Sequence, residues 1–474
     1  MSDGPVAGTF RSDVPGASSG AFPAATRKRL TGWARTSPSV ADVVAPMTRD
    51  QVAAALQRRT ERGVIARGLG RSYGDPAQNS GGLVLDMTAL NRVLDADLET
   101  GVITVEAGIS LDRLIELFVP FGFFVPVTPG TRQVTVGGAI GADVHGKNHH
   151  ADGSFCDHVL AFDLLLADGT VRTVSPDGEP DLFWATVGGM GLTGIVLSAV
   201  IRMKPIETSL VSVDTDRTRD LDEIMALMAE TDEKYTYTVA WLDCLAKGRN
   251  LGRSVLTCGE FARLEDLPAK KRAKPLQFKG GSLATVPDIM PGRLPNKFTM
   301  GLFNEMWYRK APKHKVGQLQ GITGFFHPLD GVQEWNRAYG KTGFLQYQFI
   351  VPFGHEDALR TIVETISAAG APSSLTVLKR FGPGNRGFLS FPKPGWTLTL
   401  DFPTNTPGLA GLLTRLDEIV LSNDGRMYLA KDSRMDPADM PRMYPRLEEF
   451  RTVRAKVDPD GVFVSDQARR LGLA

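Results

Sequence analysis

Apolar residues between positions 63 and 205 form short runs that glycines interrupt. Three of these runs have the length of a strand: residues 64–66, 83–85 and 103–105. Two longer runs, Leu160–Leu166 and Val171–Val174, flank Asp168-Gly169, a dipeptide typical of a β-hairpin turn. Helices are indicated at 181–186 and, behind the N-cap candidate Ser110, by four apolar residues at helical spacing: Leu111, Leu114, Ile115 and Phe118. This mixture of short strands and short helices predicts an α+β domain.

The apolar segments become longer after Pro205, over about residues 208–424. Examples are Leu345–Val351, Leu375–Leu378 and Trp396–Phe402. They predict a second domain that is built on a larger sheet. After Met427-Tyr428 the pattern is helical and charged up to Val457.

Two segments depart from this organisation. Residues 1–29 begin with a stretch rich in Gly, Ala, Ser and Pro, which predicts a disordered tail without an export signal. Residues 270–315 hold eleven Lys or Arg against Asp288 and Glu305, with many prolines and glycines, and predict a long mobile loop. Its charge fits a solvated face, and it fits equally a contact with anionic lipid or with a phosphate on the substrate.

Bulk properties exclude several classes of function. The net charge of the 474 residues is +1, which provides no global attraction for nucleic acid. The most apolar stretch, Leu114–Val127, contains Glu116 and two prolines, so any membrane contact is expected to be peripheral. The three cysteines have neither a disulfide framework nor the spacing of metal ligands: Cys156, Cys244 and Cys258.

Two glycine-rich segments carry the strongest chemical signal. Ala66–Asp75 reads ARGLGRSYGD, and Pro129–Ala142 reads PGTRQVTVGGAIGA. Glycine lets successive backbone N–H groups turn toward one anion, and a pyrophosphate is the natural ligand of such a nest. One loop of this kind is as often a plain surface turn, but two in one domain favour a dinucleotide that is held from both sides.

Gly189–Gly194 matches the G-x-G-x-x-G dinucleotide pattern literally, but that pattern needs a strand before it and a helix after it. Here a helix is predicted before it and a strand after it, so we expect a tight turn beside the ligand and no Rossmann fold.

His145, His149 and His150 lack the H-E-x-x-H arrangement of a zinc site, so no metal is expected. These histidines fit a structural role or a polar contact with a ligand. The chain has no P-loop lysine motif.

Together the two loops resemble the FAD-binding domain of flavoproteins of the vanillyl-alcohol oxidase type. Three further motifs resemble those of the decaprenylphosphoryl-β-D-ribose 2′-oxidase family, flavoenzymes of actinobacterial arabinan synthesis: HGKNHH at 145–150, FWATVGG at 183–189 and AKDSR at 430–434. The resemblance runs from about Leu30 to the last residue. It implies an α+β fold with an FAD-binding domain in 30–207 and 425–474, and a substrate domain on a large antiparallel sheet in 208–424.

By position, the resemblance assigns contacts with FAD to Gly68, Leu69, Gly70, Arg71, Ser72, Tyr73, Gly74, Asp75, Gly130, Thr135, Val136, Gly137, Gly138, Ala142, Asp143, Val144, His145, Val196 and Tyr428. In many relatives of this fold a histidine in the first loop bonds covalently to the flavin. Arg71 stands at that place here, so we expect FAD to be bound noncovalently.

The resemblance assigns contacts with the substrate to Lys147, Trp241, Gln346, Gln348, Lys379, Thr399 and Lys431. Mycobacterial members carry a cysteine where Thr399 stands, and nitroaromatic inhibitors attack its thiol. Threonine cannot form that adduct. The thiol is not needed for hydride transfer, so the difference bears on inhibition and leaves catalysis untouched.

The activity that the resemblance implies is FAD-dependent oxidation of the 2′-hydroxyl of decaprenylphosphoryl-β-D-ribose to the 2′-keto sugar. This is the first half of an epimerisation that a partner keto-reductase completes. Lys431, His145 and Tyr73 are the candidates to accept the hydroxyl proton, and Lys431 could instead stay protonated beside the reduced flavin. We expect a cytoplasmic or peripheral inner-membrane location, with an envelope location open through a partner protein.

Two rival functions remain at this point. One is a soluble sugar, alditol or aldonolactone oxidase of the same fold, for which oxygen consumption with a free polyol would be the sign. The other is a nonenzymatic nucleotide-binding protein, which would be colourless. Catalysis is favoured because polar side chains cluster on the same motifs as the glycines.

Overall fold

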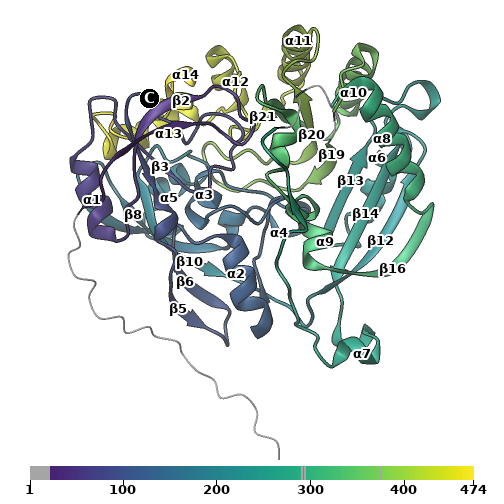
Figure 1. Cartoon of the computed structure of the whole chain (residues 1–474), viewed down its shortest axis with the longest axis horizontal. Helices are drawn as coiled ribbons and strands as arrows, with labels where there is room; N and C mark the ends of the chain where they lie inside the picture. Colours follow the sequence, from purple (N-terminus) through teal and green to yellow (C-terminus); the bar gives the residue numbers. More distant parts are fainter. Residues whose placement is uncertain (1–21, 290–291, 293–294, 374) are drawn as a thin grey trace, which may run out of the picture.

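The structure, a computed structural model, describes residues 22–289, 292, 295–373 and 375–474. Figure 1 shows two halves side by side: small sheets fill the purple-to-blue half, and one large sheet fills the teal-to-green half. The yellow C-terminal helices return to the first half. The expected α+β class with a large antiparallel sheet is confirmed. Residues 1–21 of the expected tail lie outside the described residues.

The first half contains a mixed four-stranded sheet, an antiparallel five-stranded sheet and a short strand pair. The four-stranded sheet has the order β1 (Thr26–Leu30), β2 (Ser39–Val44), β4 (Leu83–Asp86) and β3 (Val64–Arg67). The five-stranded sheet has the order β5 (Val93–Asp97), β6 (Val102–Glu106), β10 (Ile195–Arg202), β8 (Val159–Leu165) and β9 (Val171–Val174). The short pair is β7 (Phe123–Phe124) with β11 (Lys204–Pro205). The hairpin predicted around Asp168-Gly169 is confirmed, because β8 and β9 pair antiparallel.

The helices of this half are α1 (Arg49–Gln57), α2 (Leu111–Phe118), α3 (Val136–Gly141), α4 (His149–Asp152) and α5 (Pro180–Thr186). The prediction for α2 is confirmed: Ser110 caps it by accepting a hydrogen bond from the backbone N–H of Arg113, and its four apolar residues are buried. The reversed order around Gly189–Gly194 is also confirmed, since α5 precedes it and β10 follows it.

The second half is organised by an eight-stranded sheet. Its order is β16 (His314–Gly321), β12 (Leu210–Thr218), β14 (Ser254–Phe261), β13 (Tyr237–Leu242), β19 (Thr376–Phe381), β20 (Gly395–Pro403), β18 (Phe344–Pro352) and β21 (Arg426–Met427). Its helices are α6 (Leu221–Thr231), α7 (Ala269–Arg272), α8 (Lys297–Lys310), α9 (Ile322–Phe326), α10 (Glu356–Ala369) and α11 (Leu409–Ser422). A parallel pair, β15 (Ala284–Thr285) with β17 (Val332–Gln333), lies outside this sheet.

Side-chain alternation gives the large sheet two different faces. On β18, the Tyr347 hydroxyl donates to Asp417 of α11, and on β20 the Trp396 ring N–H donates to Glu356 of α10. These residues therefore lie on the face that the helices cover. Because successive side chains of a strand point to opposite faces, Gln346 and Thr399 belong to the other face.

The chain returns to the first half after β21. α12 (Met440–Met443), α13 (Leu447–Val457) and α14 (Asp466–Leu471) follow. A bridge between Phe463 and Val64 extends the edge of β3, and α13 packs against α5. This return places the residues just before it, from Tyr428 to Arg434, at the junction of the two halves.

Two expectations about irregular segments are wrong in part. The last four residues of the expected tail, 26–29, belong to β1 (Thr26–Leu30), which pairs with β2. Residues 297–310 of the expected loop form α8. The prolines and glycines that predicted a loop lie mostly outside 297–310, while Asn296 caps the helix by accepting hydrogen bonds from the N–H groups of Phe298 and Thr299.

Candidate active site

A cavity of about 1090 Å³ lies between the two halves of the molecule. The two glycine-rich loops line one side, and the uncovered face of the large sheet lines the other. Cavities for small molecules usually measure ~300–1,000 Å³, so this one has room for a dinucleotide together with a second ligand.

The first glycine-rich loop starts where β3 ends, at Arg67. A Cβ on Gly68 would lie 2.2 Å from the Thr135 hydroxyl oxygen, so the two loops touch at a point that only glycine permits. Gly70 has a φ of 65°, in the left-handed region. The backbone N–H groups of residues 69–72 donate no hydrogen bond to any part of the chain that the structure describes. They are therefore available to an anion in the cavity.

Arginine side chains hold this loop in shape. The Arg67 guanidinium donates to the carbonyl oxygens of Ala77 (2.9 Å) and Thr31 (2.8 Å). The Arg71 guanidinium donates to the Leu69 carbonyl and lies 4.2 Å from the centre of the Trp33 ring. Burial lowers the pKa of both guanidinium groups, yet a guanidinium remains protonated at any ordinary pH. The loop therefore adds positive charge to its free N–H groups.

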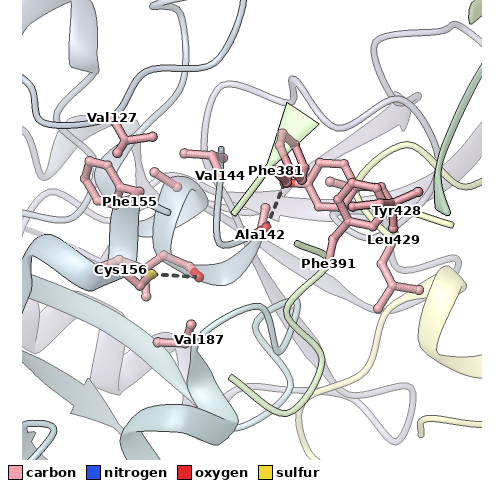
Figure 2. Packing of buried hydrophobic residues seen from close by; sticks show 14 of the residues in the cluster. Val127, Ala142, Val144, Phe155, Cys156, Val187, Phe381, Phe391, Tyr428 and Leu429 are labelled. Carbon is pink, nitrogen blue, oxygen red and sulfur yellow. Dashed lines mark hydrogen bonds between the residues drawn. The ribbon is translucent and has the colours of Figure 1, made fainter. Parts of the chain in front are cut away.

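The second loop continues into α3 and then into the histidine motif. Thr135 caps α3 by accepting a hydrogen bond from the Gly138 N–H (3.2 Å). The Tyr428 hydroxyl donates to the Ala142 carbonyl (2.7 Å), as the dashed line between these residues shows in Figure 2. Tyr428 also donates its backbone N–H to the Gln348 carbonyl. One tyrosine thus joins the second loop to β18 of the large sheet.

Three half-buried lysines, Lys147, Lys379 and Lys431, line the cavity. Burial lowers the pKa of Lys379 to about 8. Burial, with a second contribution from the charge of Lys379, lowers the pKa of Lys147 to about 7. Burial also lowers the pKa of Lys431 to about 7, against the opposing effect of the Asp401 carboxylate. An anionic ligand would relieve this accumulation of positive charge.

Lys431 lies where the two walls meet. Its ammonium nitrogen is 3.8 Å from the centre of the Tyr73 ring. The Tyr73 backbone N–H donates to the Ala430 carbonyl (2.9 Å), which ties the first loop to the turn that carries Lys431. Burial raises the pKa of the Tyr73 phenol well above its usual value, so this group stays protonated.

His145 is buried beside the same lysines. Burial, and then the charges of Lys379 and its neighbours, lowers its pKa well below the usual value, so the ring is neutral. Its Nε2 lies 2.9 Å from the side-chain nitrogen of Gln348. That amide donates to the ring nitrogen, which leaves this nitrogen engaged within the protein.

Two family models match the chain. The model described as an FAD binding domain matches residues 40–175, and the model described as D-arabinono-1,4-lactone oxidase matches residues 349–471. The decaprenylphosphoryl-beta-D-ribose oxidase of Mycolicibacterium smegmatis is 51% identical over 457 residues, which cover 95% of this chain and 99% of that protein.

The chain belongs to the decaprenylphosphoryl-β-D-ribose oxidase family. It is an FAD-dependent oxidoreductase.

More distant relatives have other names. An uncharacterized protein of Streptomyces coelicolor is 44% identical over 77% of this chain and its own full length. The L-gulono-1,4-lactone dehydrogenase of Mycobacterium tuberculosis is 23% identical over 90% of this chain and 95% of its own length. Both relatives match more of this chain than the FAD binding domain alone.

The walls of the cavity fit FAD. The free N–H groups of the first loop and the adjacent guanidinium suit a pyrophosphate, and the contact between Gly68 and Thr135 keeps side chains out of its place. Most residues assigned to FAD line the cavity: Gly68, Leu69, Gly70, Arg71, Ser72, Tyr73, Gly130, Thr135, Gly137, Gly138, Ala142, Val144, His145, Val196 and Tyr428. The residues assigned to the substrate line it as well: Lys147, Trp241, Gln346, Gln348, Lys379, Thr399 and Lys431.

Four residues assigned to FAD lie outside the cavity wall: Gly74, Asp75, Val136 and Asp143. Asp75 forms an ion pair with Arg470 (2.7 Å). Asp143 accepts hydrogen bonds from the side chains of Asn385 and Ser390, and burial raises its pKa to about 6. Val136 is fully buried in the core, and a Cβ on Gly74 would lie 1.8 Å from the Asp432 carbonyl oxygen. These residues support the loops from behind.

Asp401 is a residue of the site that sequence reasoning missed. It is completely buried on β20 and accepts a hydrogen bond from Gln346 (2.5 Å). Burial raises its pKa to about 7, and its carboxylate opposes the lowering of the Lys431 pKa. The signal was present in the alternation of β20, where Thr397, Thr399 and Asp401 are the polar positions of one face.

Among the described residues, no helix is long and apolar enough to cross a membrane. No group of three His, Cys, Asp or Glu residues that could hold a metal ion occurs there either.

Proposed function

We propose that this protein oxidises the 2′-hydroxyl of decaprenylphosphoryl-β-D-ribose to the 2′-keto sugar. The observation that supports this most is the group of three half-buried lysines opposite the glycine-rich loops, because a phosphorylated sugar is the kind of ligand that such a wall would hold. Membership of the family agrees with it, since the relative from Mycolicibacterium smegmatis carries that substrate in its name.

Bound FAD would supply the two-electron acceptor that takes the hydride from the carbinol carbon. The residues of the two glycine-rich loops would hold it noncovalently, because Arg71 stands where relatives with a covalent flavin have a histidine. Arg71 has no nucleophilic nitrogen at neutral pH, and its guanidinium is already bound to the Leu69 carbonyl.

Lys431 is the group we assign to accept the proton of the 2′-hydroxyl. With a pKa of about 7, a large share of its amine is neutral and basic near neutral pH. The proton of the O–H bond moves to the lysine nitrogen as hydride leaves C2′. The electron pair that stays on oxygen forms the new C=O bond. His145 is a weaker candidate because its Nε2 is engaged by Gln348, and Tyr73 cannot accept a proton while its phenol is protonated.

The remaining polar residues would orient the substrate. Lys147 and Lys379 provide positive charge for the phosphate. Gln346, Gln348 and Thr399 point from the sheet toward the cavity and would meet the sugar hydroxyls, while Trp241 offers an apolar surface. Tyr73 packs edge-on against Phe344 and fixes the position of the ring next to Lys431.

The product of this reaction is a lipid-linked ketose. Completion of an epimerisation requires a reduction from the other face of the carbonyl, and we assign that step to a separate keto-reductase. The lipid-linked substrate also implies contact with a membrane surface.

The test is anaerobic mixing of the purified yellow protein with decaprenylphosphoryl ribose, with the flavin absorbance near its visible maximum as the readout. We expect the absorbance to bleach with this substrate and to persist with L-gulono-1,4-lactone at the same concentration. The lactone tests the rival function of an aldonolactone oxidase, because residues 349–471 match a model described as D-arabinono-1,4-lactone oxidase. Bleaching by the lactone but not by the lipid would overturn the proposal.

A further inference from the structure

The α8 helix carries polar side chains on the side that faces the protein and large apolar side chains on the side that faces outward, the opposite of an ordinary surface helix. Polar side chains attach its inner side to the sheet. Asn304, only 2% exposed, donates to the Asp243 carboxylate (2.7 Å), Glu305 pairs with Arg253 (2.7 Å), and the Tyr308 hydroxyl donates to the Thr218 carbonyl (3.0 Å). The inner side of α8 is therefore held by hydrogen bonds and ion pairs, where an ordinary helix would bury leucine and valine.

Large apolar side chains cover the outer side of the same helix. Phe298, Leu302 and Met306 are 80%, 66% and 58% exposed, and their spacing of four residues puts them in one row. Trp307 is next to this row and 44% exposed. Monomeric soluble proteins seldom leave such a contiguous row uncovered, so the row marks a surface that another body covers.

Positive charge surrounds the row. Between residues 297 and 315 the sequence has one acidic residue, Glu305, and five Lys or Arg, all of them exposed: Lys297, Arg309, Lys310, Lys313 and Lys315. Glu305 is itself paired with Arg253 and Arg309. An apolar row inside a basic rim matches the interfacial region of an anionic bilayer, where apolar groups enter the acyl boundary and Lys or Arg meet the headgroups.

The active-site cavity reaches the surface beside this row. Its lining includes Trp307, Lys310 and Pro312 at the end of α8, and Gln318 and Gln320 on β16. β16 is the edge strand of the large sheet, and Figure 1 shows it at the right-hand margin of the molecule.

Between that edge and Lys379, the floor of the cavity is mostly apolar. β12, next to the edge, contributes Thr215, and β14 contributes Thr257 besides Val255. The next strands, β13 and β19, contribute Val239, Trp241 and Val377. The floor crosses neighbouring strands, which lie ~4.8 Å apart, so it runs well over 10 Å from the edge to the lysine. This is the shape that a long hydrocarbon chain attached to a bound headgroup needs.

We propose that the row Phe298, Leu302 and Met306 docks on an anionic lipid bilayer, and that the cavity opens there so that the hydrocarbon tail of the substrate enters along the sheet. The proposal rests on the proposed function for the identity of that lipid-linked substrate. A bilayer suits the site better than a second copy of the chain, because the basic rim would repel an identical rim.

The first experiment measures sedimentation of the purified flavoprotein with vesicles of phosphatidylcholine, alone or mixed with phosphatidylglycerol. We expect the protein to sediment with the mixed vesicles and to stay in the supernatant with phosphatidylcholine alone. The double variant L302E/M306E should partition on the order of tenfold or more weakly, since its row then carries two charges. The matched control M47E/V171E replaces two exposed apolar residues of the first half, 69% and 50% exposed, and should sediment like the wild type.

Three results would overturn the proposal. The wild type could ignore both vesicles, the L302E/M306E variant could bind as the wild type does, or binding could be equal with and without phosphatidylglycerol. If the wild type ignores vesicles and light scattering shows a dimer that L302E/M306E dissociates, the row belongs to a second copy. Flavin absorbance and circular dichroism of each variant check that it is folded.

The second experiment separates this proposal from the proposed function. Anaerobic flavin reduction is measured for the wild type and L302E/M306E with two substrates: decaprenylphosphoryl ribose in mixed vesicles, and a water-soluble phosphoryl ribose with a short prenyl chain. We expect the variant to lose rate with the vesicle substrate by about the factor it loses in partition, and to keep the wild-type rate with the short one. Equal loss with both substrates would contradict the docking role, whereas failure of the wild type with both would contradict the proposed function instead.

Discussion

Backbone atoms make up the cofactor wall of the cavity, and side chains of the large sheet make up the opposite wall. The cofactor wall comes from two continuous segments in which glycines expose N–H groups. The sheet wall comes from strands far apart in the chain, where register places Gln346 opposite Asp401 and Gln348 opposite Thr399. The difference teaches that the cofactor wall tolerates no added side chain at Gly68, whereas the sheet wall tolerates changes of shape but depends on charge.

The largest effect on flavin reduction is expected for Lys431→Ala. The cofactor wall is unchanged in this variant, so we expect the protein to remain yellow. Flavin reduction by the lipid substrate should slow by ~10²–10⁴-fold, the usual contribution of a general base. Stopped-flow absorbance measures the rate, and Lys456→Ala, an exposed lysine of α13, is the matched control. Unchanged reduction would remove Lys431 from the mechanism.

The wild-type pH profile belongs to the same test. A base works when it is deprotonated, so a lysine with a pKa of about 7 loses its proton as the pH rises through 7. The reduction rate should therefore rise across that range and level off above it. The rate of Lys431→Ala should be flat there.

A change to the cofactor wall should have the converse signature. In Gly68→Val the new side chain meets the Thr135 hydroxyl, where even a Cβ would lie at 2.2 Å. Overpacking of this kind costs ~1–3 kcal/mol, so we expect FAD to bind about 10- to 100-fold more weakly. Flavin fluorescence released on dilution measures the affinity. Gly411→Ala on α11, which has open space around it, should keep FAD, and a Gly68→Val protein that stays fully loaded on dilution would contradict the account.

A finer test of the sheet wall is Asp401→Asn, which keeps the shape and removes the charge. The Asp401 carboxylate raises the pKa of Lys431, so its removal should lower that pKa. The midpoint of the pH–rate profile should move to lower pH while the plateau at high pH changes little. A merely structural role would lower the plateau and leave the midpoint in place.

The smallest effect is expected for Thr399→Cys. Thr399 lines the cavity without a part in proton transfer, so flavin reduction should stay within about threefold of the wild type, as for other near-isosteric changes. The new thiol should form an adduct with nitroaromatic inhibitors that mass spectrometry detects. The wild type should form none, and an adduct on the wild-type protein would contradict this expectation.

The same contrast explains how far sequence reasoning reached. Both glycine-rich loops were predicted because their signal is local: Gly68 and Thr135 each stand within a compact motif. Asp75 and Asp143 belong to the motifs, but their side chains bind Arg470 and Ser390 and lie outside the cavity wall. A motif specifies which residues are near the ligand, and the backbone decides which of them face it.

The sheet wall was predicted only as far as the family resemblance reached. Asp401 was missed although the alternation of β20 was visible, because its pairing with Gln346 depends on a register between strands 55 residues apart. The α8 helix was missed for another reason. The prolines and glycines of residues 270–315 predicted a loop, although they lie mostly outside Lys297–Lys310.

The central claim is that hydride leaves C2′ of the ribose while Lys431 takes the hydroxyl proton. The most direct measurement is the rate of anaerobic flavin reduction by decaprenylphosphoryl ribose with deuterium at C2′, compared with the unlabelled lipid. The account predicts a primary isotope effect, a several-fold slower reduction, with deuterium at C2′ and none with deuterium at C3′. Equal rates for the C2′-labelled and unlabelled lipids, together with slowing by deuterium at C3′, would contradict it.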